Sequence, residues 1–387
     1  MARVESKSRD ETPLVQDLRL VIVIDRFTVL GGAQKVIADQ ANFWDTKGWK
    51  VDLMSLEDPV GGAPAFPLNS GVKFTSLATD ERIVRTVPYL TRLRRLLYLR
   101  RSILARRPNV VLGIMPVAAT KVLQALAGSR IPVIAVEHCD PASQPLPETL
   151  VKLRRRLYPK AASVVCLNER AMGYFSEKIQ SKGAIIPNAV TLPTVTLTEA
   201  NLKREPGRKY AIFVGRLDPI QKRVDRLITA FAAVAGRHPE WILELWGEGE
   251  DRDNLHSLIQ AKELSSQVRL MGPTRCPFAV MRASHLLLLT SEFEGMPLVI
   301  GEAMAAGLPV VTFDCPTGPR EMIRHEVDGI LVPNGDVTEF AKALERIFTD
   351  EPLRLNLALK APEVLNRFSL DKIMSMWCQT ITVVANA

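Results

Sequence analysis

Short, almost continuously apolar runs alternate along this chain with stretches whose apolar residues recur at helical spacing. Runs of this length are typical of buried parallel strands, which need a crossover helix between one strand and the next. The pattern therefore predicts an α/β fold in which doubly wound parallel sheets carry helices on both faces. The clearest strand candidates are residues 18–24, 50–56, 110–114, 132–136, 164–168, 210–214, 242–246, 268–272 and 286–289.

The length of 387 residues favours two such domains over one. The alternation restarts after residues 191–208, a segment rich in threonine, proline and charge that is typical of an interdomain linker. We therefore expect a first Rossmann-like domain over 18–190 and a second over 209–368. Residues 1–17 are polar and predict a flexible tail, and residues 61–79 are rich in turn formers and uninformative about secondary structure.

Cysteine usage and hydropathy bear on where the protein works. The five cysteines are scattered and form no Cys-x-x-Cys pair, which argues against a zinc site or a disulfide framework. No run approaches eighteen uninterrupted apolar residues, and the first residues lack the apolar core of a secretory signal. These features predict a cytoplasmic protein without a transmembrane helix.

Residues 290–311 contain the densest set of functional signals. Pro297 suits the first turn of a helix because its missing N–H would be unpaired there, and Gly307 and Pro309 suit the end of that helix. A helix that begins at the carboxyl end of a parallel strand offers unpaired N–H groups and a partial positive charge to a phosphate.

Two carboxylates flank this phosphate seat, Glu294 in the loop and Glu302 in the second helical turn. They would repel phosphate, but an ionised carboxylate is a strong acceptor for paired hydroxyl groups of a sugar or a ribose. A nucleotide sugar combines all three groups. The alternative is that Glu294 only caps the helix and Glu302 is a solvated surface residue.

The Glu294-x7-Glu302 spacing, set within Ser-Glu-Phe-Glu-Gly-Met-Pro and Glu-Ala-Met-Ala-Ala-Gly-Leu-Pro-Val-Val, closely resembles the donor-site signature of a known family. This is the glycosyltransferase group 1 (GT4-like) family of retaining glycosyltransferases with the GT-B fold. The resemblance implies two Rossmann-like domains facing a cleft and a C-terminal helix, about residues 369–385, packed back on the first domain. It also implies chemistry with a nucleotide-sugar co-substrate and no other cofactor or metal. The diphosphate is expected at Gly295, Met296, Pro297 and Leu298 and the ribose at Glu302, with Glu294 as a catalytic residue.

The segment that opens the second half also resembles the family, in its Gly-Arg-Leu…Gln-Lys-Gly pattern. Arg216 and Lys222 are the matching cations, and an arginine fork with a lysine point charge suits a diphosphate. Ile220 lengthens this loop by one residue, and Arg223 stands where many members have a small residue.

Two features of the first half are predicted to reach the same site. His138 follows the strand at 132–136, so it could enter a ligand cleft or be an ordinary structural histidine. The family often has a histidine here that contacts the donor sugar, which favours the first reading. Gly32, in a Gly-Gly pair, matches a family loop that faces the phosphates and the acceptor.

Between Glu81 and Glu137 the chain has no acidic residue, and it carries a leucine- and tyrosine-containing helical pattern rich in arginine. Such a helix can lie on an anionic membrane surface, bind a lipid-pyrophosphate acceptor, or be a solvated face. A second basic cluster, at 152–160, lies in the same half. Nucleic acid is not expected, because no nucleic-acid motif or aromatic stacking run accompanies the net charge of +8. The arginines predicted to bind a membrane or an acceptor are Arg92, Arg94, Arg95, Arg100 and Arg101.

These features predict a retaining, metal-independent glycosyltransferase. Its donor would be a nucleoside diphosphate sugar, expected to be UDP-hexose or UDP-N-acetylhexosamine. Its acceptor would be a glycan or a lipid-linked oligosaccharide at the cytoplasmic membrane face. Two alternatives remain at this point: a GT-B-fold epimerase that needs no acceptor, and a basic membrane-binding protein with a degenerate site.

Overall fold

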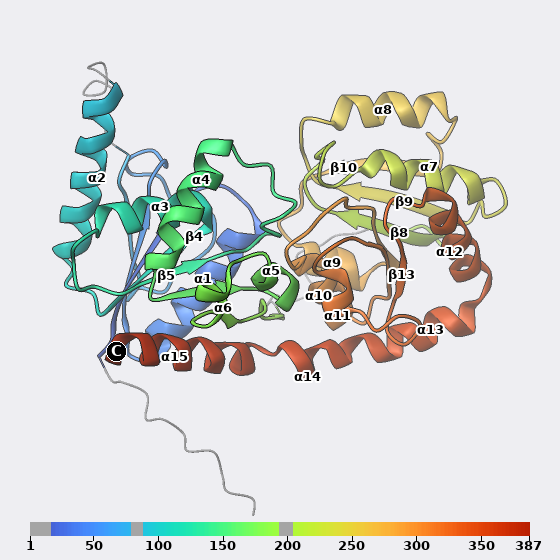
Figure 1. Ribbon diagram of the computed structural model, residues 1–387. Coiled ribbons are helices and arrows are strands. Elements are labelled where there is room, and N and C mark those ends of the chain that lie inside the picture. The colour runs from blue at the N-terminus through green and yellow to red at the C-terminus, as the bar shows by residue number, and fades with distance from the viewer. Residues whose placement is uncertain (1–16, 79–87, 193–203) are drawn as a thin grey trace, which may run out of the picture.

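The computed structural model describes residues 17–78, 88–192 and 204–387, and it places them around two parallel β-sheets (Figure 1). Nearly all of the predicted tail and most of the predicted linker lie outside the described residues. The first sheet has seven strands in the order β3-β2-β1-β4-β5-β6-β7, and the second has six in the order β10-β9-β8-β11-β12-β13. Both confirm the predicted doubly wound α/β architecture.

The first sheet consists of β1 (Arg19–Ile24), β2 (Lys50–Ser55), β3 (Lys73–Ser76), β4 (Val110–Ile114), β5 (Val133–Val136), β6 (Ser163–Cys166) and β7 (Ala184–Ile185). Its helices are α1 (Gly32–Thr46), α2 (Pro88–Leu104), α3 (Met115–Ala125), α4 (Glu148–Leu157), α5 (Glu169–Gly173) and α6 (Glu177–Gln180). The second sheet consists of β8 (Lys209–Val214), β9 (Trp241–Trp246), β10 (Val268–Gly272), β11 (Leu286–Leu289), β12 (Val310–Asp314) and β13 (Ile330–Pro333). The helices after β8 are α7 (Val224–Ala235), α8 (Arg252–Ala261), α9 (Pro277–Arg282), α10 (Leu298–Ala305), α11 (Pro319–Met322), α12 (Val337–Thr349), α13 (Glu351–Lys360), α14 (Val364–Phe368) and α15 (Leu370–Asn386).

The nearly continuous apolar strands are explained by burial on both faces. Along β1, Leu20 and Ile22 pack into one cluster with α1 and α15, whereas Val21 and Val23 pack into another with α2 and α3. A strand with both faces covered cannot alternate apolar and polar residues, because each face lies under a helix.

Residues 61–79, whose sequence was uninformative, contain a regular element. β3 (Lys73–Ser76) lies there and pairs in parallel with β2 at the edge of the first sheet. Its four residues are Lys-Phe-Thr-Ser, and none is buried. A short polar edge strand lacks the apolar run by which the buried strands were recognised.

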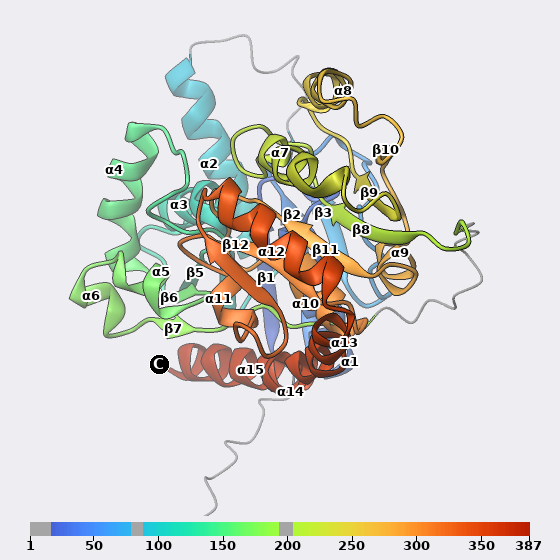
Figure 2. The same ribbon diagram turned by 90° about the vertical axis from the view of Figure 1, so that its right-hand side faces the viewer.

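The chain crosses between the domains twice, and the two crossings lie side by side. The N–H of Val190 donates to the carbonyl of Phe368 at 2.8 Å, and Val190 also bridges to Ser369. Beyond this point α15 runs back along the first domain, where the ring of Trp377 packs edge-on against Trp44 at 6.1 Å (Figures 1 and 2).

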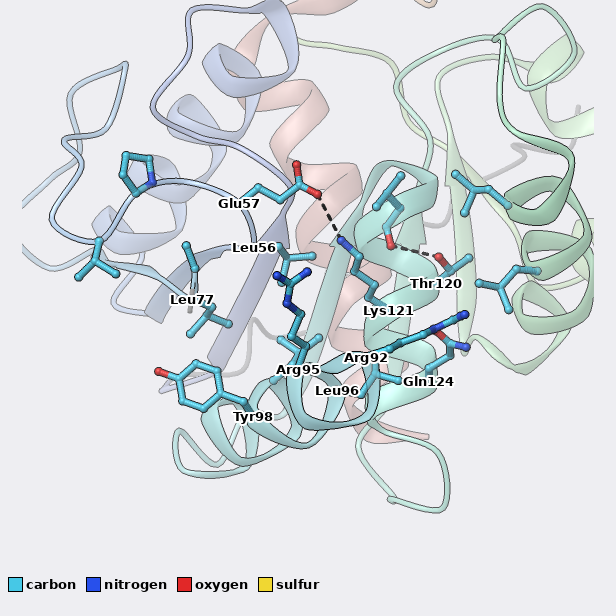
Figure 3. A pocket seen from close by; sticks show the side chains of 17 residues that line it. Leu56, Glu57, Leu77, Arg92, Arg95, Leu96, Tyr98, Thr120, Lys121 and Gln124 are labelled. Carbon is cyan, nitrogen blue, oxygen red and sulfur yellow. Dashed lines mark hydrogen bonds and ion pairs between the residues drawn. The ribbon is translucent and has the colours of Figure 1, made fainter. Parts of the chain in front are cut away.

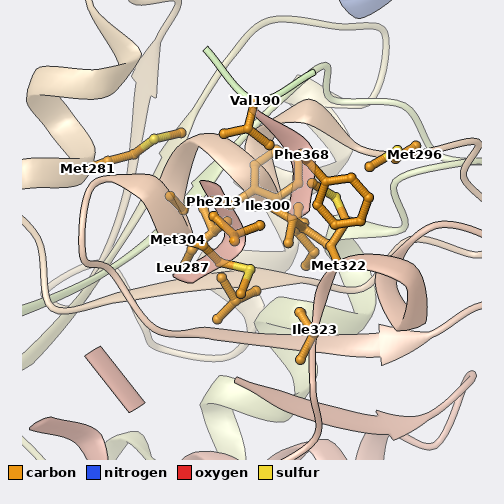
Figure 4. Packing of buried hydrophobic residues seen from close by; sticks show 14 of the residues in the cluster. Val190, Phe213, Met281, Leu287, Met296, Ile300, Met304, Met322, Ile323 and Phe368 are labelled. Carbon is orange, nitrogen blue, oxygen red and sulfur yellow. The ribbon is translucent and has the colours of Figure 1, made fainter. Parts of the chain in front are cut away.

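Helix α10 lies at the junction between the domains. Ile300 and Met304 are buried against the second sheet, as Figure 4 shows. A Cβ added to Gly301 would lie 2.5 Å from Val190 Cγ2 and 2.6 Å from Met322 Cε. A glycine is therefore needed for the first crossing to pass this close to the helix.

Candidate active site

Glu294 lies in the loop between β11 and α10 and is almost fully buried. Its Oε1 is 2.5 Å from the Nζ of Lys222, and its Oε2 is 3.4 Å from the side-chain amide of Gln221. The hydroxyl of Thr317 donates to the backbone carbonyl of Glu294 and so ties this loop to the one that follows β12. Two residues that were predicted to contact different parts of a ligand are thus in direct contact with each other.

The start of α10 is open to an anion. The helix begins at Leu298, and its N-cap, Pro297, has no side-chain group to offer. No described residue accepts a hydrogen bond from the N–H groups of Leu298 and Val299. Unpaired amides at a helix N-terminus carry a partial positive charge and bind anions readily.

The loop between β8 and α7 supplies two cations to this region. The side chain of Arg216 is 67% exposed and makes only long contacts, 3.5 Å to Asp218 and 3.4 Å to Gln221. Lys222 is held in place by Glu294, as described above. The loop therefore presents one free guanidinium and one fixed ammonium beside the start of α10.

The Gly-x-Gly sequence after β9 keeps that loop in place. A Cβ on Gly247 would lie 1.8 Å from the carbonyl oxygen of Gly215, and one on Gly249 would lie 2.1 Å from that of Leu217. The sequence shows these glycines but cannot show which backbone they contact, so their structural role was not predicted.

His138 reaches the site from the first domain. A Cβ on Gly295 would lie 2.0 Å from the carbonyl oxygen of His138, so the loops after β5 and before α10 are in backbone contact. The His138 ring is buried, and neither ring nitrogen has a hydrogen-bond partner among the described residues. Burial lowers the pKa of His138 to about 4, with the side chain of Asn188 opposing the shift. The imidazole is therefore neutral at physiological pH, with one ring nitrogen able to donate a hydrogen bond and the other able to accept one.

This buried histidine gives a test by pH. Between pH 6.5 and about 4 the unfolded chain binds a proton at His138 that the folded chain does not, so the folded state loses stability as the pH falls. The loss levels off below about pH 4 and amounts to about 3 kcal/mol at most. Urea unfolding at several pH values should show a shallower acid loss for His138→Gln than for the wild type. Identical pH profiles for the two proteins would contradict the burial of a neutral ring.

Glu302 also lies between the domains. Its Oε1 is 3.8 Å from the Nζ of Lys35 in α1, which in turn contacts Asp39 and Thr191 at 2.9 Å each. Burial raises the pKa of Glu302, and the ammonium of Lys35 opposes that shift. Gly32, the first residue of α1, lies close to the start of α10. A Cβ added to Gly32 would be 3.7 Å from Leu298 Cδ1. The predicted ribose residue therefore faces a cation of the first domain, which the sequence gave no means of predicting.

A buried ionic group supports the loop that carries His138. Glu137 is fully buried, accepts from the Tyr158 hydroxyl at 2.6 Å and lies 3.7 Å from the Nη1 of Arg154. Burial raises the pKa of Glu137 to about 7, whereas Arg154 and Tyr158 oppose the rise. Of the basic cluster noted at 152–160, Arg154 is therefore not part of the exposed surface, because its side chain is 2% exposed and turned inward.

The arginines predicted on α2 differ in their surroundings. Arg92, Arg94, Arg95 and Arg101 are exposed, with no hydrogen bond or ion pair to any described residue. Arg100 instead donates to the backbone carbonyls of Ala125 at 2.7 Å and Ala127 at 3.1 Å, so it anchors α2 to the end of α3.

Neither a metal cluster nor a membrane-spanning helix is present among the described residues. They contain no group of three His, Cys, Asp or Glu side chains that could hold a metal ion. The Asp-x-Asp sequence 251–253 lies at the start of α8, where Asp251 accepts from Asn254 at 3.0 Å. In the same part of the chain, no helix has both the length and the apolar character needed to cross a bilayer.

Two family models match the chain. The model described as "Glycosyl transferases group 1" matches residues 196–364, and that described as "Glycosyl transferase 4-like domain" matches residues 31–189. The two matches together take in both domains and the segments that form the site.

Individual relatives point in the same direction. The chain is 37% identical over 264 residues to an exopolysaccharide phosphotransferase of Streptomyces coelicolor, and this match spans 66% of the chain but only 27% of that protein. It is 26% identical over 368 residues to the amylovoran biosynthesis glycosyltransferase AmsD of Erwinia amylovora, covering 93% of this chain and 98% of that protein. Among solved structures, Anabaena HepE in complex with UDP and glucose is similar with a TM-score of 0.75 at 19% identity, covering 95% of this chain and 100% of that one. This structural likeness shows a shared fold.

Proposed function

The chain belongs to the glycosyltransferase group 1 family, with its GT-B fold, and we propose that it transfers a sugar from a nucleoside diphosphate donor to an acceptor hydroxyl. One observation carries this proposal. Lys222, Glu294 and the open start of α10 meet at one point, where a cation, a hydroxyl acceptor and unpaired amides are all within reach of a single ligand.

Each group has a defined task in the proposed reaction. The bond between the anomeric carbon and the diphosphate oxygen breaks, a bond from that carbon to the acceptor oxygen forms, and the acceptor proton passes to the departing diphosphate. Negative charge grows on the diphosphate, where Arg216, Lys222 and the α10 amides stabilise it. The Lys222 ammonium has three donors and can keep Glu294 while it binds a phosphate oxygen.

The remaining groups orient the donor. Glu294 would accept hydrogen bonds from the sugar hydroxyls, and Glu302 would hold the ribose. His138 would contact the sugar from the first domain as a neutral ring, so that the reaction requires both domains together. The configuration at the anomeric carbon would be retained, as the resemblance implies, and no metal would be needed.

The donor and acceptor are proposed from chemistry and from the relatives. HepE was solved with UDP and glucose, and AmsD is named as a glycosyltransferase of amylovoran biosynthesis, which favours UDP-hexose or UDP-N-acetylhexosamine and a saccharide acceptor. We place the reaction at the cytoplasmic face of a membrane, on a glycan or a lipid-linked oligosaccharide. The exposed arginines of α2 support that placement.

Calorimetry with UDP, GDP, ADP and their common sugars, with and without EDTA, tests the donor site. We expect tight binding of one nucleotide that EDTA does not change. Glu302→Ala should raise its Kd about 30-fold, since hydrogen bonds to a charged group contribute about 2 kcal/mol. Lys35→Ala is the matched control, because it removes the contact across the domains and keeps the carboxylate.

An equal loss of nucleotide affinity in the Glu302→Ala and Lys35→Ala variants would indicate that Glu302 only helps to hold the domains together. Binding of no nucleotide would contradict the donor site. Conversion of the donor to an isomer without an acceptor would replace transfer by the epimerase alternative.

A further inference from the structure

The first domain contains a cavity of about 1,120 Å³ whose lining includes none of the donor-site residues Glu294, Lys222 and Glu302. It is enclosed by α2, α3, the start of α4 and the segments that follow β2 and β3, as Figure 3 shows. Because Leu56 and Leu77 directly follow β2 and β3, the cavity opens at the carboxyl edge of the sheet, where α/β folds bind ligands.

The cavity is mostly apolar but has one polar corner. Leucines of α2 and α4, among them Leu96, Leu99 and Leu153, form much of its wall. In the polar corner, Glu57 lies 3.5 Å from the Nζ of Lys121 (Figure 3). Glu57 also lies 3.5 Å from the Nε of Arg26. A ligand that fills this space must therefore be apolar over most of its length.

Two guanidinium groups of the wall lack an ionic or hydrogen-bonding partner within the described part of the chain. Arg92 and Arg95 line the cavity, and no described residue forms a hydrogen bond or an ion pair with either. Arg100 and Arg106 of the same segment are both engaged, Arg100 by backbone carbonyls and Arg106 by Asp52 at 3.0 Å. Arginine is well suited to bind phosphate with its planar fork, so the two free groups complement an anionic phosphate.

The polar corner leads toward the candidate active site. Arg26 follows β1, and its carbonyl accepts from the side chain of Gln34 at 3.0 Å in the first turn of α1. The same turn begins at Gly32, which lies beside Leu298 at the start of α10. A ligand in the cavity can thus point one end at the site where the sugar would be transferred.

We propose that this cavity binds the acceptor as one amphiphile, a phosphate or diphosphate ester of a long isoprenoid or alkyl chain. Arg92 and Arg95 hold the phosphate, the leucines cover the chain, and the group to be glycosylated extends past Glu57 toward Gly32. This assignment rests on the proposed function. A bilayer surface fits less well, because it cannot enter a cavity and would engage the outward arginines of α2 equally.

The arginines of α2 supply a matched test. Binding of farnesyl diphosphate, below its critical micelle concentration, is measured by calorimetry on the full chain without donor. We expect Arg92→Ala/Arg95→Ala to weaken it at least 30-fold. Arg94→Ala/Arg101→Ala, which removes the same charge from the same helix outside the cavity, should change it less than 3-fold. Leu150→Gln, in the apolar wall, should weaken the binding of farnesyl diphosphate and leave the binding of inorganic pyrophosphate unchanged.

Three results would overturn the proposal. The first is an equal loss in the two double variants. The second is binding of pyrophosphate as tight as that of farnesyl diphosphate, which would indicate a cation cluster alone. The third is a protein that binds phosphatidylglycerol vesicles but does not bind farnesyl diphosphate, which would indicate that α2 contacts a bilayer instead. Nucleotide binding reports separately on the donor site, so a failure there is distinguishable from a failure here.

Discussion

Replacing Lys222 with alanine is expected to lower kcat by about 100- to 1,000-fold, the loss typical of removing one group that stabilises charge in a transition state. The ammonium lies 2.5 Å from Glu294 beside the open start of α10, where the departing diphosphate would gain its charge. KM for the donor should change far less, because the interaction strengthens as the bond breaks. Steady-state rates at saturating donor and acceptor give the comparison.

Arg223→Asn is the matched control for this experiment. It removes the neighbouring cation, which is paired with Asp225 at 2.8 Å and makes no contact with Glu294. Arg223 has a φ of +47°, and asparagine tolerates that left-handed conformation well. If kcat for Lys222→Ala is close to that for Arg223→Asn, Lys222 does not stabilise the departing diphosphate.

Arg154→Ala is expected to lower the free energy of unfolding by about 3 to 5 kcal/mol, the usual cost of leaving one partner of a buried ion pair without the other. Arg154 lies over the rings of Tyr174 and Phe175, at 4.9 and 5.7 Å, so packing is lost as well. Urea denaturation measures the change.

The loss should grow with pH. Without Arg154 the pKa of the buried Glu137 carboxyl rises further above its unfolded value, so stability falls as the pH increases through neutrality. Glu137→Gln in the same chain should recover part of the stability at pH 8. The control is Arg155→Ala, because this neighbour is exposed, and we expect a change within about 0.5 kcal/mol. Equal effects of the Arg154 and Arg155 substitutions would contradict the buried ion pair.

The sequence was sufficient for the features that depend on local spacing. Pro297 and Gly307 bracket α10 as expected, with Pro297 as N-cap and Gly307, at a φ of +77°, just beyond the C-cap. The strand before this helix and the loop carrying Arg216 and Lys222 also lie where they were predicted. Helix caps and buried strands are specified by neighbouring residues, so one segment is enough to recognise them.

Contacts between distant segments could not be predicted in this way. Nothing in the run Arg154-Arg155-Arg156 shows which arginine turns inward, because that depends on Glu137 in another element. The pairs Lys222–Glu294 and Lys35–Glu302 join residues that are distant in sequence and come together only through the arrangement of the sheets. The cavity under α2 is likewise formed by several elements at once.

The hydrogen bond between the two interdomain crossings limits how the halves of the molecule can move. Because Val190 is bonded to Phe368, the two crossings are held together at one point, and we expect the domains to rotate about this pivot rather than slide apart. Gly301, packed against Val190, lies at this pivot and should move least. Close by, the side chain of Asn188 donates to the carbonyl of Met296 at 3.3 Å, so the loop that carries Gly295 is also tied to the first domain near this pivot. Parts of the site that lie farther from Val190 would therefore separate more than Gly301 does when the domains rotate apart.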